Sequence, residues 1–233
     1  MSIFALADPH LGHGVDKAMD IFGPRWERHA ERMAENWRAC VGDDDWVLVP
    51  GDISWALKLE DALVDLRFLA DLPGRKLLLK GNHDYWWTSR GKVEAVLPPS
   101  LSLLQNDAFD LGDGIGVVGA RGWTPPGAPR ATEQDEKIFL REVQRLELSI
   151  RAAGDRFERL IAMLHYPPVY EGLGETALVA PLRAAGVSVC LYGHLHGNDH
   201  RFAVQGDRNG IRYYFVAADA IDFTPVRVEL PVS

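Results

Sequence analysis

The chain contains the stretch Lys76-Leu77-Leu78-Leu79-Lys80-Gly81-Asn82-His83-Asp84, in which an apolar run leads directly into a polar turn. The run at 76–80 has the length and composition of a buried strand. Open α/β sheets gather their ligands at the carboxyl ends of strands. The stretch therefore predicts an α/β fold with a polar site at a strand end.

Four further polar clusters are spread along the chain: Asp8-Pro9-His10, Gly51-Asp52, His165 and Gly193-His194-Leu195-His196. Strand-like apolar runs lie before them, at Ile3–Ala7, Trp46–Pro50, Leu160–Leu164 and Val187–Tyr192. Asp, His and Asn side chains are suitable ligands for divalent cations. The repeated pattern predicts that several strand ends bring such side chains to one metal site.

Helical patterns separate the strand-like runs. Apolar spacing predicts helices that include residues 26–37, 59–70, 139–150 and 176–185, with Thr132 as an N-cap and Gly186 as a stop. Another strand is expected at Ile115–Gly119, a hairpin at Arg201–Gln205 and Ile211–Ala217, a final strand at Val226–Leu230, and a proline-rich loop at 122–129. Such alternation favours βαβ units, and the length suits one domain, residues 1–233.

The composition is that of a soluble globular protein, with 47% apolar and 25% charged residues. No apolar run is long enough for a membrane span, and the first residues lack the basic segment of a signal peptide, so a cytoplasmic location is expected. Two cysteines, Cys40 and Cys190, cannot form a disulfide framework. The net charge of −8 makes nucleic acid an unlikely partner, because duplex binding usually needs a basic stripe.

The spacing within the clusters suggests how they would bind metal. Asp8 and His10 flank one residue, so at an extended strand end their side chains would share a face. The two oxygens of Asp52 could bridge two cations, and Asn82 offers a neutral amide oxygen. His194 and His196 would again share a face, and His165 ends its own apolar run.

Each cluster alone has an ordinary explanation. A lone Asp-Pro-His or Gly-Asp is usually a turn, and a lone histidine at a loop entrance is usually a satisfied polar residue. The strongest single piece of evidence for a metal site is the pair of histidines one residue apart, His194 and His196. His29 is expected on the surface of a helix. His13 and His200 are expected in ordinary loop positions, with contact to a nearby ligand side chain as the alternative. The clusters carry the metal hypothesis jointly, by their order along the chain.

This ordered set resembles the calcineurin-like metallophosphoesterase superfamily, whose motifs are matched from Asp8 to His196. The resemblance implies a four-layer αββα sandwich of two mixed sheets flanked by helices. It also implies one metal ion held by Asp8, His10, Asp52 and His196, and a second held by Asp52, Asn82, His165 and His194. His83 would face the substrate as a catalytic residue, with Asp84 orienting its ring.

The sequence departs from two branches of the superfamily. Protein Ser/Thr phosphatases carry an Asp-Arg-Gly after the second cluster, whereas this chain reads Ile53-Ser54-Trp55. Purple acid phosphatases place a tyrosine where Trp55 stands. The third cluster, ending in Asp84, is more similar to that of phosphodiesterases, nucleases and small-molecule phosphohydrolases.

The resemblance implies hydrolysis of a small organic phosphodiester or phosphomonoester by direct attack of a metal-bridging hydroxide. Arg121 is expected to hold a phosphate oxygen, and Trp86, Trp87 and other aromatics near the clusters to contact the substrate. The ligand set suits Mn, Fe or Zn alike, and oligomeric state is left open. The alternatives are a nuclease-like activity on nucleic-acid ends, or a non-catalytic scaffold that binds a partner.

Overall fold

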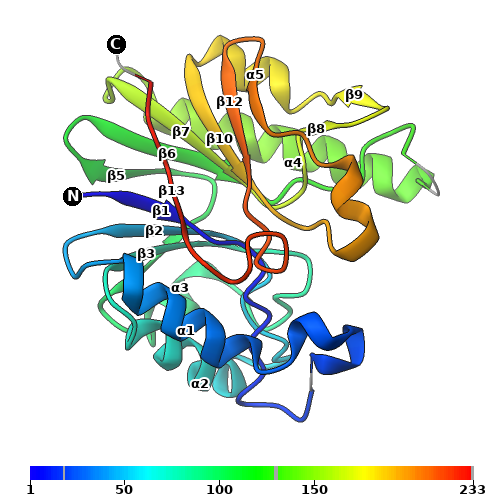
Figure 1. The fold of residues 1–233 in the computed structure, drawn as a ribbon. Helices are drawn as coiled ribbons and strands as arrows, with labels where there is room; N and C mark the ends of the chain where they lie inside the picture. Colours follow the sequence, from blue (N-terminus) through cyan, green and yellow to red (C-terminus); the bar gives the residue numbers. More distant parts are fainter. Residues whose placement is uncertain (18, 129–130, 232–233) are drawn as a thin grey trace.

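The computed structural model describes residues 1–17, 19–128 and 131–231. Two mixed β-sheets lie face to face, and helices cover their outer faces (Figure 1). This arrangement confirms the predicted α/β fold of two mixed sheets flanked by helices.

The first sheet has five strands in the order β13-β1-β2-β3-β4. Strands β1, β2, β3 and β4 run parallel, and β13 pairs antiparallel with β1 at one edge. Their bounds are β1 Ile3–Ala5, β2 Trp46–Pro50, β3 Arg75–Leu79, β4 Leu101–Leu104 and β13 Val226–Arg227.

The second sheet has six strands in the order β11-β12-β10-β7-β6-β5. Its four inner strands are parallel, and the edge strands β11 and β5 pair antiparallel. Their bounds are β11 Gly206–Arg208, β12 Ile211–Phe215, β10 Val187–Tyr192, β7 Arg159–Leu164, β6 Ile115–Ala120 and β5 Ala108–Gly112. A separate ribbon pairs β8 Val169–Tyr170 with β9 Gly174–Glu175.

The helices divide between the two sheets (Figure 1). On the first sheet lie α1 His29–Cys40, α2 Leu59–Ala70 and α3 Arg90–Glu94, and on the second lie α4 Glu133–Ala153 and α5 Val179–Ala184. Three short 3-10 helices, η1 Asp20–Phe22, η2 Pro24–Trp26 and η3 Gly197–Phe202, lie in connections. As expected, Thr132 caps α4, in a capping box with Asp135.

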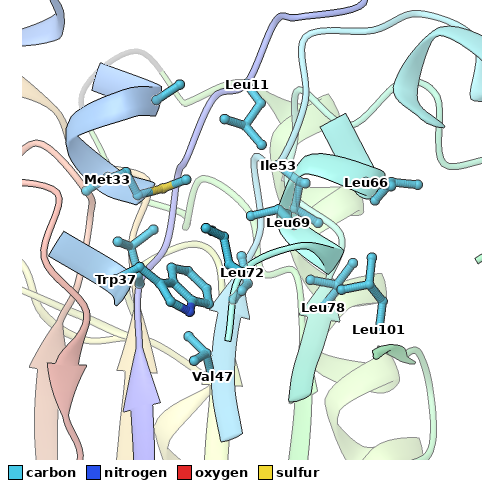
Figure 2. Packing of buried hydrophobic residues seen from close by; sticks show 14 of the residues in the cluster. Leu11, Met33, Trp37, Val47, Ile53, Leu66, Leu69, Leu72, Leu78 and Leu101 are labelled. Carbon is cyan, nitrogen blue, oxygen red and sulfur yellow. The ribbon is translucent and has the colours of Figure 1, made fainter. Parts of the chain in front are cut away.

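Alternation along the buried strands divides the core into layers. Val47 and Val49 of β2 join a cluster with Trp37 of α1 and Leu66 of α2, part of which Figure 2 shows. Leu48, on the opposite face of β2, packs in the layer between the two sheets. Because successive side chains of a strand point to opposite faces, a strand covered on both sides is apolar throughout.

Several sequence expectations need correction. The first hairpin strand is Gly206–Arg208 instead of Arg201–Gln205, because residues 197–202 form the 3-10 helix η3 and Asn209-Gly210 makes a tight turn with positive φ at both residues. The helix expected over 176–185 is shorter, at Val179–Ala184. Strands β4 and β5 were not expected at all. In the proline-rich loop, residues 122–128 are described without regular structure, and Pro129 lies outside the described residues.

Within the described ranges, no helix is both long and apolar enough to cross a membrane. The cytoplasmic location and the single domain over residues 1–233 stay predictions.

Leu48→Ala tests the layer between the sheets. Leu48 is fully buried there, so its truncation should lower the free energy of unfolding by about 2–5 kcal/mol. Denaturant unfolding followed by circular dichroism measures the change. Val64→Ala on α2, where Val64 is 46% exposed, is the control and should stay within about 0.5 kcal/mol of the parent. Equal losses in both variants would show that this layer is not tightly packed.

Candidate metal centre

The candidate ligands come together at the carboxyl ends of strands from both sheets. Asp8, His10 and His196 form one group whose ligand atoms all lie within 4.8 Å of one another. Asp52, His165 and His194 form a second group by the same measure. Asn82 joins the second group, since its Oδ1 lies 2.7 Å from Nε2 of His165. Each group could hold a metal ion. Asp52 of the second group also reaches the first, because its Oδ2 lies 3.4 Å from Nε2 of His165 and 3.7 Å from Nε2 of His10.

The backbone that carries these side chains is strained. Asp8, His10, Asp52 and His194 all have positive φ, between 44° and 74°. The expectation that Asp8 and His10 share a face of an extended strand is therefore wrong, although their side chains do meet. Hydrogen bonds hold the strained loops together, with the N–H of Asp8 donating to Gly51 O (3.0 Å) and that of His10 to Asp52 O (3.0 Å).

Two glycines allow the loops to approach closely. A Cβ added at Gly81 would lie 2.1 Å from Oδ1 of Asp52, and one added at Gly193 would lie 2.2 Å from Oδ2 of Asp8. Neither space could hold any side chain. The Gly-Asn and Gly-His motifs therefore need glycine because each packs against a carboxylate of the centre.

The tautomer of His165 is fixed by its surroundings. Its Nδ1 donates to the carbonyl oxygen of Pro50 (2.9 Å), which can only accept, so Nε2 of the neutral ring carries a lone pair. Burial lowers the pKa of His165 to about 3, so the ring is neutral at pH 7. Its Nε2 faces Oδ1 of Asn82 and, at 3.4 Å, Oδ2 of Asp52. Nε2 of His165, Oδ1 of Asn82 and Oδ2 of Asp52 are thus three acceptors that converge without a donor between them. This arrangement suits a cation that all three would bind.

Asp8 and His10 of the first group and His194 of the second also contribute buried acceptors. The buried Oδ1 of Asp8 has no hydrogen-bond partner among the described residues. Burial lowers the pKa of His10 and of His194 well below the usual range, so both rings are neutral ligands. Burial raises the pKa of Asp8, an effect that a bound cation would oppose.

Asp219 is the functional residue that the sequence analysis missed. It follows β12, and its Oδ1 lies 2.8 Å from Nδ1 of His196, so Nε2 of His196 is directed toward Nε2 of His10 at 3.3 Å. Such a carboxylate orients a ligand histidine and raises its basicity. The sequence feature that could have indicated Asp219 is its position after the apolar run Ile211–Ala217. His200 also lies beside it, with Nε2 3.0 Å from Oδ2.

The charge state of His196 differs from that of the other rings. Burial alone would lower its pKa, but the hydrogen bond that the ring donates to Asp219 and the charges of Asp8, Asp219 and Asp52 raise it to about 8. In the metal-free protein the ring of His196 is therefore protonated on both nitrogens and positively charged at neutral pH.

Asp84 does not have the position expected for it. Its fully buried carboxylate accepts from the N–H groups of Ile53 (2.8 Å), Ser54 (3.1 Å) and Gly81 (2.7 Å), and from Nε1 of Trp86 (2.9 Å). Among the hydrogen bonds of the described residues, none joins it to the ring of His83. Asp84 therefore clamps the loop of Asp52 to the loop of Asn82, and the prediction that it orients His83 is wrong.

His83 itself lies beside the centre. Its backbone N–H donates to Oδ1 of Asp52 (2.8 Å), and its ring lies 4.5 Å from the ring of Trp55. Burial lowers the pKa of His83, while the charge of Asp52 raises it.

Trp86 and Trp87 are core residues, contrary to the expectation that they bind substrate. They are 0% and 1% exposed and pack in the cluster beneath the first sheet. Their indole N–H groups are used internally, by Asp84 and by Oε1 of Gln105. The two indole rings therefore fill the space beneath the loop of Asn82.

Arg121 is ion-paired within the protein. Its Nη2 lies 3.1 Å from Oε1 of the buried Glu142, which also pairs with Arg145 at 2.5 Å. The backbone oxygen of Arg121 accepts from the N–H groups of His165 and Tyr166. A contact of Arg121 with a phosphate oxygen stays a prediction.

His29 was expected on the surface and instead supports the centre. Its ring is partly buried, and Nε2 lies 3.1 Å from the carbonyl oxygen of Pro9 and 3.2 Å from that of His10. It steadies the strained first loop from α1.

A cavity of about 340 Å³ opens beside the centre. Its polar lining consists of His10, His83 and His196, and its apolar lining of Met19, Phe22, Trp26 and Trp55. Imidazoles and apolar side chains therefore both face any bound molecule.

Comparison with known proteins agrees with this geometry. A family model described as calcineurin-like phosphoesterase matches residues 1–198. The chain belongs to the calcineurin-like phosphoesterase family. This confirms the resemblance inferred from the motifs.

Two curated relatives are the gene 66 proteins of Mycobacterium phages L5 and D29. Both are 38% identical to this chain, over 78 and 84 residues, which are 34% and 36% of it. The aligned regions span only 37% and 40% of the lengths of those relatives.

Similar solved structures include a phosphopantetheinyl hydrolase, PptH, from Mycobacterium tuberculosis (13% identity, TM-score 0.56, 97% of this chain and 95% of that one). Others are TT1561 of Thermus thermophilus (14%, 0.52, 98% of both chains) and a putative 5′-nucleotidase from Staphylococcus aureus (13%, 0.53, 91% and 47%). At these identities the likeness concerns the fold.

Asp219→Ala tests the support of His196. Loss of the carboxylate frees the imidazole to rotate and lowers its basicity, so Mn²⁺ affinity should fall by about 10–100-fold. Isothermal titration calorimetry measures the affinity. Asp222→Ala, at a side chain 76% exposed, is the matched control and should bind Mn²⁺ like the parent. Unchanged affinity in Asp219→Ala would exclude the orienting role.

Mn²⁺ affinity should also depend on pH through His196. Because the pKa of this ring is about 8 in the metal-free protein, a ligating cation must displace its proton below that pH. Affinity should fall by about tenfold per pH unit from pH 8 toward 6.5, with release of one proton per protein. Calorimetry in buffers of different ionisation enthalpy measures the release, and a pH-independent affinity would contradict the expectation.

Proposed function

We propose that the protein is a metal-dependent phosphoric ester hydrolase with two divalent cations. The observation that carries the proposal is the convergence of two acceptor-rich groups that share Asp52. One cation would take Asp8, His10, Asp52 and His196, and the other would take Asp52, Asn82, His165 and His194. The activities for which two proteins of similar structure are named, a phosphopantetheinyl hydrolase and a putative 5′-nucleotidase, support the same class of reaction.

The chemistry divides between the cations and the protein. When bound, a pair of divalent cations polarises phosphoryl oxygens and lowers the pKa of coordinated water from about 15.7 to about 7. The protein supplies a rigid ligand cage, because the loops of Asp8, Asp52 and Asn82 are hydrogen-bonded to one another. His83, which lines the cavity, transfers a proton to the leaving oxygen, a step worth about 10²–10⁴-fold.

Two other functions are less well supported. A nuclease-like activity would need a basic approach path, whereas the chain carries a net charge of −8 and the cavity has an apolar wall. A non-catalytic scaffold would have no need for ligand groups held in strained backbone, and every candidate ligand is retained.

Asp52→Asn and His83→Ala separate the contribution of the cations from that of proton transfer by His83. Asp52 is the side chain that both cations would share, so Asp52→Asn should abolish nearly all turnover. His83→Ala should leave a weak, Mn²⁺-dependent remnant, reduced about 10²–10⁴-fold. Release of nitrophenol from mono- and bis-(4-nitrophenyl) phosphate, with and without Mn²⁺, measures both.

The control is Asp155→Asn, which should keep parental activity because Asp155 is exposed and is not a candidate ligand. Full Mn²⁺-stimulated turnover by Asp52→Asn would refute the role of Asp52 as a ligand of both cations. Absence of turnover by the parent protein with every ester and metal tested would refute the hydrolase.

A further inference from the structure

A second cavity, of about 180 Å³, lies where strands β3, β4 and β6 end beside α4. Its lining includes Leu79, Leu104 and Ala120, the last residues of these strands. Among the described residues, none lines both this cavity and the one at His83, and no candidate metal ligand lines it. Pockets for drug-sized ligands begin at about 300 Å³, so the second cavity suits a small ion or group.

The polar lining of the second cavity is rich in positive charge. Lys80, Arg121 and Arg145 contribute three cations, and the one carboxylate among the described lining residues is Glu142. The lining is therefore cationic, in a chain whose net charge is −8. A concave site lined by charges of one sign concentrates ligands of the opposite sign, which here are anions.

Neutral side chains add hydrogen-bond donors to the same lining, which also includes Thr88, Gln105 and Asn106. Oε1 of Gln105 accepts from Nε1 of Trp87 (3.1 Å), so the remaining polar group of Gln105 is its amide nitrogen, a donor. Nζ of Lys80 donates to the carbonyl oxygen of Trp87 (2.6 Å), and an ammonium group has two further hydrogens. The lining can thus donate to several oxygens of one small anion.

Glu142 and Arg121 each keep a polar atom without a partner. Glu142 is 1% exposed, and its Oε1 pairs with Nη2 of Arg121 (3.1 Å) and Nη1 of Arg145 (2.5 Å). Its Oε2 and Nε of Arg121 are buried, and neither has a hydrogen-bond partner among the described residues. Unpaired buried groups of this kind are costly. A ligand that offers a donor to Glu142 and an acceptor to Arg121 would remove the cost.

An oxyanion with a hydroxyl group offers both. Monohydrogen phosphate has three oxygens that accept from cations and one hydroxyl that can donate to Oε2 of Glu142. Sulfate has no hydroxyl at neutral pH, and a phosphate monoester loses its second proton near pH 6. Either of these anions would therefore place an acceptor against Oε2, which leaves the carboxylate unpaired and repelled.

We propose that the second cavity binds inorganic phosphate, with Lys80, Arg121 and Arg145 donating to its oxygens and Glu142 accepting from its hydroxyl group. Arg side chains suit this role because charge-assisted hydrogen bonds to phosphate are short and strong. The site needs no metal ion and stands apart from the proposed hydrolase. Inorganic phosphate is also what hydrolysis of a phosphomonoester releases, so the anion in question is a product of that class of reaction.

The test measures anion binding to the metal-free protein. Calorimetry after treatment with EDTA, at about pH 8, compares inorganic phosphate, sulfate and methyl phosphate. Phosphate should bind at least about tenfold more tightly than either of the other anions, because it alone has the hydroxyl group. Arg145→Gln should weaken phosphate binding about tenfold or more, since it removes a charged donor from a side chain that is 51% exposed.

Two further variants make the result specific. Arg151→Gln removes a cation of the same helix that does not line the cavity and is 64% exposed, so it should bind phosphate like the parent. Glu142→Gln replaces an acceptor by an amide that can donate, so it should bring the affinities for sulfate and phosphate close together. Equal affinity of the parent for phosphate and sulfate, or equal phosphate affinity in Arg145→Gln and Arg151→Gln, would refute the site. Failure of the hydrolase is a different result, since it would show as absent ester turnover with metal present.

Discussion

The candidate metal centre depends on the close approach of loops that belong to two different sheets. Gly81 lies against the carboxylate of Asp52, and Gly193 against that of Asp8, with no room for a Cβ at either place. Asp84 adds a clamp of backbone hydrogen bonds between two of these loops. A site assembled in this way is rigid before any ligand arrives, which is what metal ligation and phosphoryl chemistry require.

This packing has an electrostatic cost that a cation would remove. Several carboxylate, amide and imidazole acceptors are buried together, and the hydrogen bond from His165 to Pro50 excludes a proton from the nitrogen that faces them. Buried acceptors without donors are unfavourable. Among the histidines of the two candidate ligand groups, His196, hydrogen-bonded to Asp219, is the ring whose pKa of about 8 makes it positively charged near neutral pH, so pH would act on metal binding through this ring.

The same geometry separates the roles of the aromatic residues. Trp86 and Trp87 lie below the loop of Asn82 and support it from the core. Trp55 and Phe22 lie at the cavity instead, although Phe22 is far from any ligand motif in the chain. Proximity in sequence indicated Trp55 together with Trp86 and Trp87, and only Trp55 lines the cavity, because a residue that follows a strand end can turn either into the core or toward the site.

The sequence by itself determined the α/β class and the groups that meet at the centre, because buried strands require continuous apolar runs and polar residues follow the strand ends. The arrangement in two sheets came from the resemblance of the motifs to a known family. It could not reveal the partnership of Asp219 with His196, the clamp made by Asp84, or the pairing of Phe22 with Trp55. These are contacts between segments far apart in the chain, or choices of side-chain direction within a loop. Only the packing of the two sheets decided them, since distance and orientation in space have no counterpart in local residue order.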